Sequence, residues 1–163
     1  MTIIVGFSTS TSVISRIIRW FTRSKASHSW VAFDCGELGL RLIMHASVGG
    51  YKLNQWTKWR KDNQIVAMYI CQEDLSDGLR KMAEQLDKPY DYWSVIMLAP
   101  KRWFGKLYKN PVQDGDKRLH CSEALARLLQ AHGFAKDLDP ESTTPENLLE
   151  FCAGNPAFTP TEE

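Results

Sequence analysis

Two strand-like segments joined by a short turn constrain the fold of this chain more than any other feature. Residues 28–34 ("HSWVAFD") and 40–47 ("LRLIMHAS") are rich in β-branched and aromatic residues, and the turn-prone "CGELG" separates them. This pattern predicts an antiparallel β-hairpin. Because one face of such a hairpin must be buried, its register decides which side chains share a face.

The register places two histidines together. If Phe33 and Leu40 flank the loop, paired residues have numbers that sum to 73, which puts His28 directly opposite His45. A shift of two in that sum makes the histidines diagonal neighbours, whereas an odd shift separates their faces. The pair can be a polar patch near the end of a half-exposed sheet, a metal site without a third ligand at diagnostic spacing, or part of a catalytic group.

The remaining elements follow from hydrophobic periodicity, and no linker divides the chain. We expect one domain over residues 1–154 and a loose tail over 155–163. In the first helix, Val13, Ile17 and Phe21 recur at helical spacing. The predicted strands are 2–8 and 64–70, the predicted helices are 10–24, 76–87, 91–99, 121–132 and 143–152, and 101–118 is a predicted irregular connection.

Composition excludes several classes of protein. Of 163 residues, 44% are hydrophobic and 24% are charged, which is ordinary for a folded domain, and the net charge of +1 does not suggest nucleic acid binding. The four cysteines lack C-x-x-C spacing, so we expect free thiols and no metal. With neither a signal-like start nor a long apolar run, we expect a protein that is cytoplasmic as synthesised.

Positive charge is concentrated in one segment of the predicted irregular connection. This cluster is either a solvated loop face or a contact for an anionic substrate or membrane surface. Its members are Lys101, Arg102, Lys106, Lys109, Lys117 and Arg118.

Cys121 begins the helix predicted at 121–132, in "LHCSEALARLL". The first turn of a helix has unpaired N–H groups and the positive end of the dipole, which favour a thiolate. None of the other cysteines is predicted at such a position. We therefore expect Cys121 to be the reactive thiol and to be ionised near neutral pH.

A thiol nucleophile needs a base, and the base needs a third group that orients it. His28 is the candidate base, with His45 bonded to its other ring nitrogen and the N–H of Cys121 as an oxyanion donor. His120 adjoins the thiol, but successive residues at a strand-to-helix junction point apart. Glu123 is expected to complement the helix dipole.

Five short motifs resemble, by their order along the chain, those of a known family. "ASHSWVAFD", "LIMHAS", "KPYDYWS", "HCSEALARLL" and "TTPENLLE" resemble, in that order, the circularly permuted branch of the NlpC-type papain-like cysteine hydrolases. In this branch the histidine strand precedes the cysteine helix. The similarity covers roughly residues 1–150.

The resemblance implies an α+β fold with a small antiparallel β-sheet packed against the helix that carries the cysteine. It implies a Cys–His dyad with a third polar residue, which map onto Cys121, His28 and His45. The tyrosine that lines the oxyanion region maps onto Tyr90, for which an ordinary half-buried aromatic is an equal interpretation. Many permuted relatives have an acid or another polar group at the position of His45.

The expected function is therefore hydrolysis of an amide or peptide bond through a thioester on Cys121, without a cofactor. The substrate would be a peptide, a peptidoglycan peptide or another acyl compound. We expect a phage or bacterial protein that works inside the cell or within a larger particle. Lipid acyl hydrolysis or transfer, with membrane contact, is an alternative that the same residues would serve. A non-catalytic interaction module is the third.

Overall fold

The computed structural model describes residues 1–97, 99, 100 and 117–162. Residues 101–116 of the connection predicted at 101–118, with four of the six residues of its basic cluster, lie outside these residues. The strands are β1 (Ile3–Thr9), β2 (His28–Cys35), β3 (Leu40–Ser47), β4 (Gly50–Gln55), β5 (Gln64–Cys71) and β6 (Phe158–Pro160). The helices are α1 (Val13–Thr22), α2 (Trp56–Trp59), α3 (Ser76–Ala83), α4 (Tyr92–Met97), α6 (Cys121–Gln130) and α7 (Pro145–Gly154).

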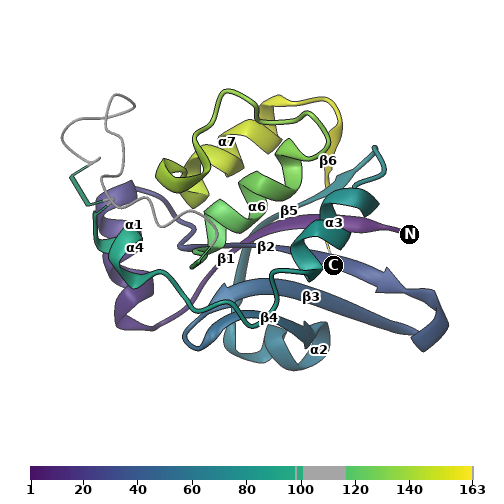
Figure 1. Ribbon diagram of the computed structural model, residues 1–163, viewed down its shortest axis with the longest axis horizontal. Coiled ribbons are helices and arrows are strands. Elements are labelled where there is room, and N and C mark those ends of the chain that lie inside the picture. Colours follow the sequence, from purple (N-terminus) through teal and green to yellow (C-terminus); the bar gives the residue numbers. More distant parts are fainter. Residues whose placement is uncertain (98, 101–116, 163) are drawn as a thin grey trace.

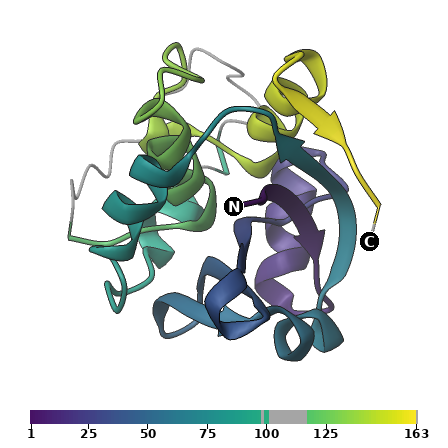
Figure 2. The same ribbon diagram turned by 90° about the vertical axis from the view of Figure 1, so that its right-hand side faces the viewer.

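The strands form one antiparallel sheet in the order β4-β3-β2-β1-β5-β6. Helices α3, α6 and α7 lie over one face, and α2 lies on the other (Figure 1). Figure 2 shows the same layers from the side. The protein is thus α+β, as expected. No helix in the described part of the chain is both long enough and apolar enough to span a bilayer.

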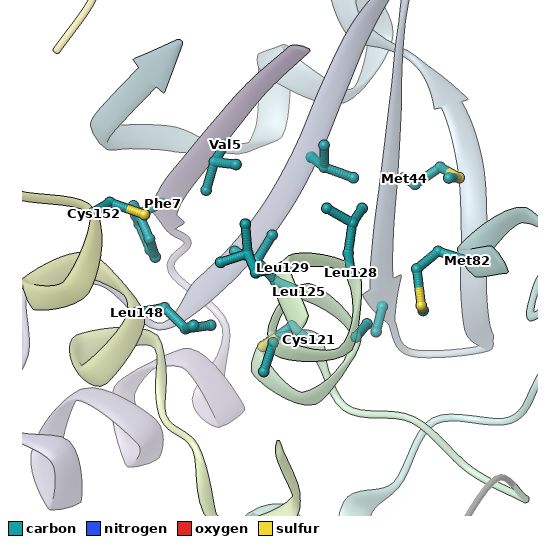
Figure 3. Packing of buried hydrophobic residues seen from close by; sticks show 14 of the residues in the cluster. Val5, Phe7, Met44, Met82, Cys121, Leu125, Leu128, Leu129, Leu148 and Cys152 are labelled. Atoms are coloured by element: carbon teal, nitrogen blue, oxygen red, sulfur yellow. The ribbon is translucent and has the colours of Figure 1, made fainter. Parts of the chain in front are cut away.

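Alternation along β2 separates two hydrophobic cores. Val31 packs in the larger core, which α6 and α7 cover with leucines and Cys152 (Figure 3). Trp30 and Ala32 point to the opposite face, where Trp56 and Trp59 of α2 complete a smaller core. Successive residues of a strand point to opposite faces, so this one strand contributes to both cores.

Helix α1 does not bury the face that its sequence predicts. Phe21 is buried, but Val13 and Ile17 are 61% and 47% exposed. Ser15, Ile18 and Phe21 make up the buried face instead. The helix has apolar residues on two sides, so periodicity did not identify which side meets the sheet.

Two strands were absent from the predictions. In β4, the segment "GYKLNQ" is largely polar because it forms the edge of the sheet, and it pairs with β3. The tail, predicted to be loose from residue 155, contains β6, which pairs with β5 and buries Phe158 to 4% exposure. The expectation of a loose tail is wrong for this segment, because a single buried aromatic side chain and the open edge of β5 order it.

Gly6 allows the smaller core to close. It pairs with Trp30 across β1 and β2, and a Cβ atom at residue 6 would lie 2.1 Å from Cη2 of the Trp30 ring. Trp30 is 1% exposed and packs against Trp56 and Trp59 with ring centroids 5.0 and 5.3 Å away. The ring therefore cannot retreat without disturbing two other tryptophans.

We predict that Gly6→Ala lowers the free energy of unfolding by about 2 kcal/mol through overpacking, which corresponds to a fall in Tm of about 4–8 °C. Gly36→Ala is the matched control, because a Cβ atom there would meet nothing within 4 Å. Thermal denaturation followed by circular dichroism measures both. Equal Tm values for the two variants would contradict this packing.

Candidate active site

The hairpin brings His28 and His45 into contact. Trp30 pairs with His45 and Cys35 with Leu40, so paired residues have numbers that sum to 75 rather than the predicted 73. The predicted register is therefore off by two, and the histidines are diagonal neighbours on one face. Nε2 of His28 lies 3.3 Å from Nδ1 of His45.

Asn54 of β4 extends this pair into a chain of three polar side chains. Its Oδ1 lies 3.1 Å from Nε2 of His45. An amide oxygen only accepts, so Nε2 of His45 carries the proton and Nδ1 of His45 accepts from Nε2–H of His28. Nδ1 of His28 is then left with a free lone pair. Sequence reasoning missed Asn54 because β4 was not recognised.

Both imidazoles are neutral at physiological pH. Burial, reinforced by the neighbouring His45, lowers the pKa of His28 from 6.5 to about 3. Burial also lowers the pKa of His45 to about 4, and the charge of Lys52 acts in the same direction, against the hydrogen bond to Asn54. The ring of Trp59 covers the pair, with centroids 6.3 Å from His28 and 5.7 Å from His45.

Cys121 begins α6, as predicted, but its thiol is not an exposed thiolate. The residue is 3% exposed, and the backbone and hydroxyl of Ser29 lie beside the sulfur. Burial raises the pKa of Cys121, while hydrogen bonds from the backbones of Ser29 and Ser122 lower it by less. The expectation of an ionised thiol is therefore wrong, because desolvation outweighs the first turn of the helix.

The thiol and the imidazoles lie on opposite sides of β2. Cys121 belongs to the larger core under α6, whereas His28 shares the face of Trp30 and Trp59. In the part of the chain that the structure describes, no hydrogen bond joins the sulfur to either histidine. The structure thus brings His28 into contact with His45. The thiol of Cys121 lies instead beside Ser29, the residue that follows His28 in β2.

A cavity of about 300 Å³ lies at the beginning of β2, and Cys121 is not among the described residues that line it. His28 and His45 line it from one side, and Ser27 and Tyr90 from the other. Ser27 belongs to the helix side, because its hydroxyl bonds that of Ser15 on α1. The cavity is therefore a place where groups from both faces of β2 meet.

Tyr90 lies in this cavity as a buried, neutral phenol. It is 8% exposed, and an isolated β-bridge pairs it with Leu119, which precedes Cys121 by two positions in the sequence. Burial, and then the charge that Cys121 can carry, raises the pKa of Tyr90 well above 10. Its hydroxyl is therefore a hydrogen-bond donor at any physiological pH.

His120 and Glu123 have structural roles. Nε2 of His120 lies 3.3 Å from the backbone oxygen of Thr143, and the backbone N–H of His120 donates to Glu123 at 3.4 Å. The carboxylate of Glu123 also accepts from Arg127 at 2.8 Å. These contacts cap α6 and hold the imidazole of His120 in the interior, so it is unsuited to be the base.

Comparisons with known proteins support the fold alone. No family model and no curated protein matches the chain. Among solved structures, the chain is similar to yiiX from Escherichia coli O157:H7, which is described as a metalloprotein of DUF1105. The sequence identity is 18% and the TM-score 0.55, over 99% of this chain and 96% of that one.

The histidine pair, of which His45 is buried and His28 partly buried, makes stability depend on pH. Their folded pKa values lie below 6.5, so the unfolded state binds protons that the folded state does not. Their contribution is complete above pH 6.5 and is lost as the pH falls toward 4. We predict that the free energy of unfolding falls by up to about 2 kcal/mol per histidine between pH 7 and pH 5.

Urea denaturation at pH 7, 6 and 5 measures this loss. In His45→Gln one of the two titrating groups is absent, so the fall should be about half that of the unaltered protein. Parallel stability profiles for the protein and its variant would contradict the assignment.

Proposed function

We propose that the protein is a cysteine hydrolase that cleaves an amide or peptide bond through a thioester on Cys121. The observation that carries this proposal is the chain His28–His45–Asn54, which fixes the tautomer of His28 at a cavity. The next residue of β2, Ser29, lies beside the thiol that begins α6. A hydrogen-bonded pair of neutral imidazoles with one free lone pair has the form of an oriented general base. The nearby thiol supplies the nucleophile.

The structure corresponds to a resting state of such an enzyme. Sγ of Cys121 must leave the helix side of β2, or the ring of His28 must turn toward it, before proton transfer takes place. His28 is the first residue of β2, and the cavity already reaches around this end of the strand to Ser27 and Tyr90. We infer that side-chain rotation at this end of the strand brings the two groups together.

In the reaction, Nδ1 of His28 takes the thiol proton while Sγ attacks the carbonyl carbon of the substrate. The tetrahedral adduct collapses to a thioester, and the amine leaves with the proton from His28. Water then adds to the thioester with His28 again as the base, which releases the acid and restores the thiol. Because the resting thiol is neutral, each acylation needs this proton transfer, unlike a mechanism that starts from a thiolate.

Two donors are suited to the oxyanion of the adduct. The N–H of Cys121 belongs to the first turn of α6 and lacks a partner within the helix. Tyr90, whose phenol is neutral, lines the cavity of His28. Preorganised donors of this kind stabilise the transition state more than the substrate, because the charge develops only there.

The description of yiiX as a metalloprotein does not name the metal, and the residues of this site do not form a typical metal site. Zinc sites use three or four ligands. Among the described residues, no group of three His, Cys, Asp or Glu side chains could hold a metal ion. The ring nitrogens of His28 and His45 that face each other share one proton, so they do not both offer lone pairs. We therefore assign no step to a metal.

Lipid acyl hydrolysis is a second candidate, favoured by the exposed face of α1. Val13, Ile17 and Trp20 follow one another at helical spacing and are 61%, 47% and 55% exposed. Arg16 and Arg23 belong to the same helix and its C-terminal cap. An apolar stripe beside cationic residues is typical of helices that lie in an anionic membrane surface.

Acyl trapping tests the thioester. We predict that incubation with peptidoglycan peptides, isopeptides or lipid esters leaves an acyl adduct on Cys121, detected by intact-mass and peptide mass spectrometry. Cys121→Ala abolishes the adduct, and His28→Ala slows its formation about 10²- to 10⁴-fold because the base is lost. Cys35→Ala is the matched control and retains it. Equal modification of Cys35 and Cys121 would indicate a non-catalytic module.

Vesicle sedimentation tests the lipid candidate separately. We predict that the protein sediments with vesicles of phosphatidylcholine and phosphatidylserine, and that Ile17→Ser reduces the bound fraction several-fold by removing apolar contact. Leu38→Ser is the control, since Leu38 is 63% exposed but lies at the far end of the hairpin. Equal binding by both variants would contradict a role for α1.

A further inference from the structure

A second pocket, of about 580 Å³, adjoins the cavity of His28. Arg16 and Arg19 line it from α1, and Arg60 and Lys61 line it from the turn after α2. We call it the arginine pocket. It shares Ser10 and Asn63 with the cavity, so the two hollows meet beside the loop between β1 and α1.

The arginine pocket concentrates positive charge. Among the described residues that line it, four are cationic and one, Asp62, is a carboxylate, which is a difference of +3. The whole chain carries only +1. Like charges gathered at one place repel one another, and a bound anion relieves that repulsion. The charge of this pocket is therefore a property of the site and not of the general composition.

Arg19 lacks the partner that a structural arginine normally has. Its Nε atom is buried and has no hydrogen-bond acceptor. Within the described part of the chain, no carboxylate forms an ion pair with Arg19, nor does Asp62 pair with a neighbouring cation. A buried donor without an acceptor is costly. A ligand with two oxygens would supply acceptors in the geometry that a guanidinium fork prefers.

We propose that the arginine pocket binds an anionic group of the substrate, a carboxylate or a phosphate, while the scissile carbonyl lies in the cavity of His28. The placement of the scissile carbonyl in the cavity of His28 rests on the proposed function. The binding of an anion in the arginine pocket does not depend on catalysis. The pocket then determines specificity, because a substrate without a negative charge at this distance does not offset the positive charge that lines the pocket. A phosphate would fit a lipid substrate, and a carboxylate would fit a peptide.

Calorimetric titration in a Cys121→Ala background separates binding from chemistry. The probes are inorganic phosphate and glutarate, which distinguish the two sources of negative charge. We predict saturable binding of at least one probe, weakened about tenfold or more in Arg19→Gln because a charge-assisted pair is lost. Arg16→Gln, at an exposed position, serves as the second variant in case Arg19→Gln destabilises the fold.

Arg80→Gln is the matched control, since Arg80 pairs with Asp77 on the exposed surface of α3. It should bind both probes as the parent protein does. Tighter binding of phosphate or of glutarate supports the pocket and identifies its ligand class. Absence of saturable binding for both probes, or equal binding by the Arg16, Arg19 and Arg80 variants, would overturn the proposal while leaving the acyl-trapping result unaffected.

Discussion

The alternation of side chains along β2 is the constraint on which the rest of the structure depends. One residue, Ser29, faces the first turn of α6 and lies beside the thiol of Cys121, while its neighbours His28 and Trp30 face α2. The same strand thus anchors both cores and holds the candidate nucleophile and base on either side of itself. The cavity lies at the first residue of the strand, where both His28 and Ser27 line it.

Desolvation governs the chemistry of this site. It keeps the thiol of Cys121 protonated, and it keeps both histidines unprotonated far below their ordinary pKa. The structure therefore holds no preformed ion pair of thiolate and imidazolium between these residues, and the proposed proton transfer requires the two groups to be brought together first. The arginine pocket has the opposite character, because it gathers groups that keep their positive charge.

Sequence patterns predicted the parts of the fold that local chemistry specifies. The hairpin follows from its turn residues, and the start of α6 at Cys121 follows from its apolar stripe. The helix predicted at 143–152 is α7, where Thr144 is the N-cap and Pro145 the first residue. The hairpin register was off by two residues, yet the histidines still met, because an even shift preserves the face. β4 and β6 were missed because their polar or short segments become strands only beside an existing edge.

The sequence by itself determined the helix start at Cys121 and the shared face of His28 and His45, since both depend on local periodicity, and its family resemblance implied the α+β class. Tertiary structure alone decided that the thiol is buried under β2, that Asn54 orients the histidine pair and that Arg16 and Arg60 line one pocket. These properties depend on contacts between segments far apart in the chain. Burial and its effect on the pKa arise only when those segments pack together.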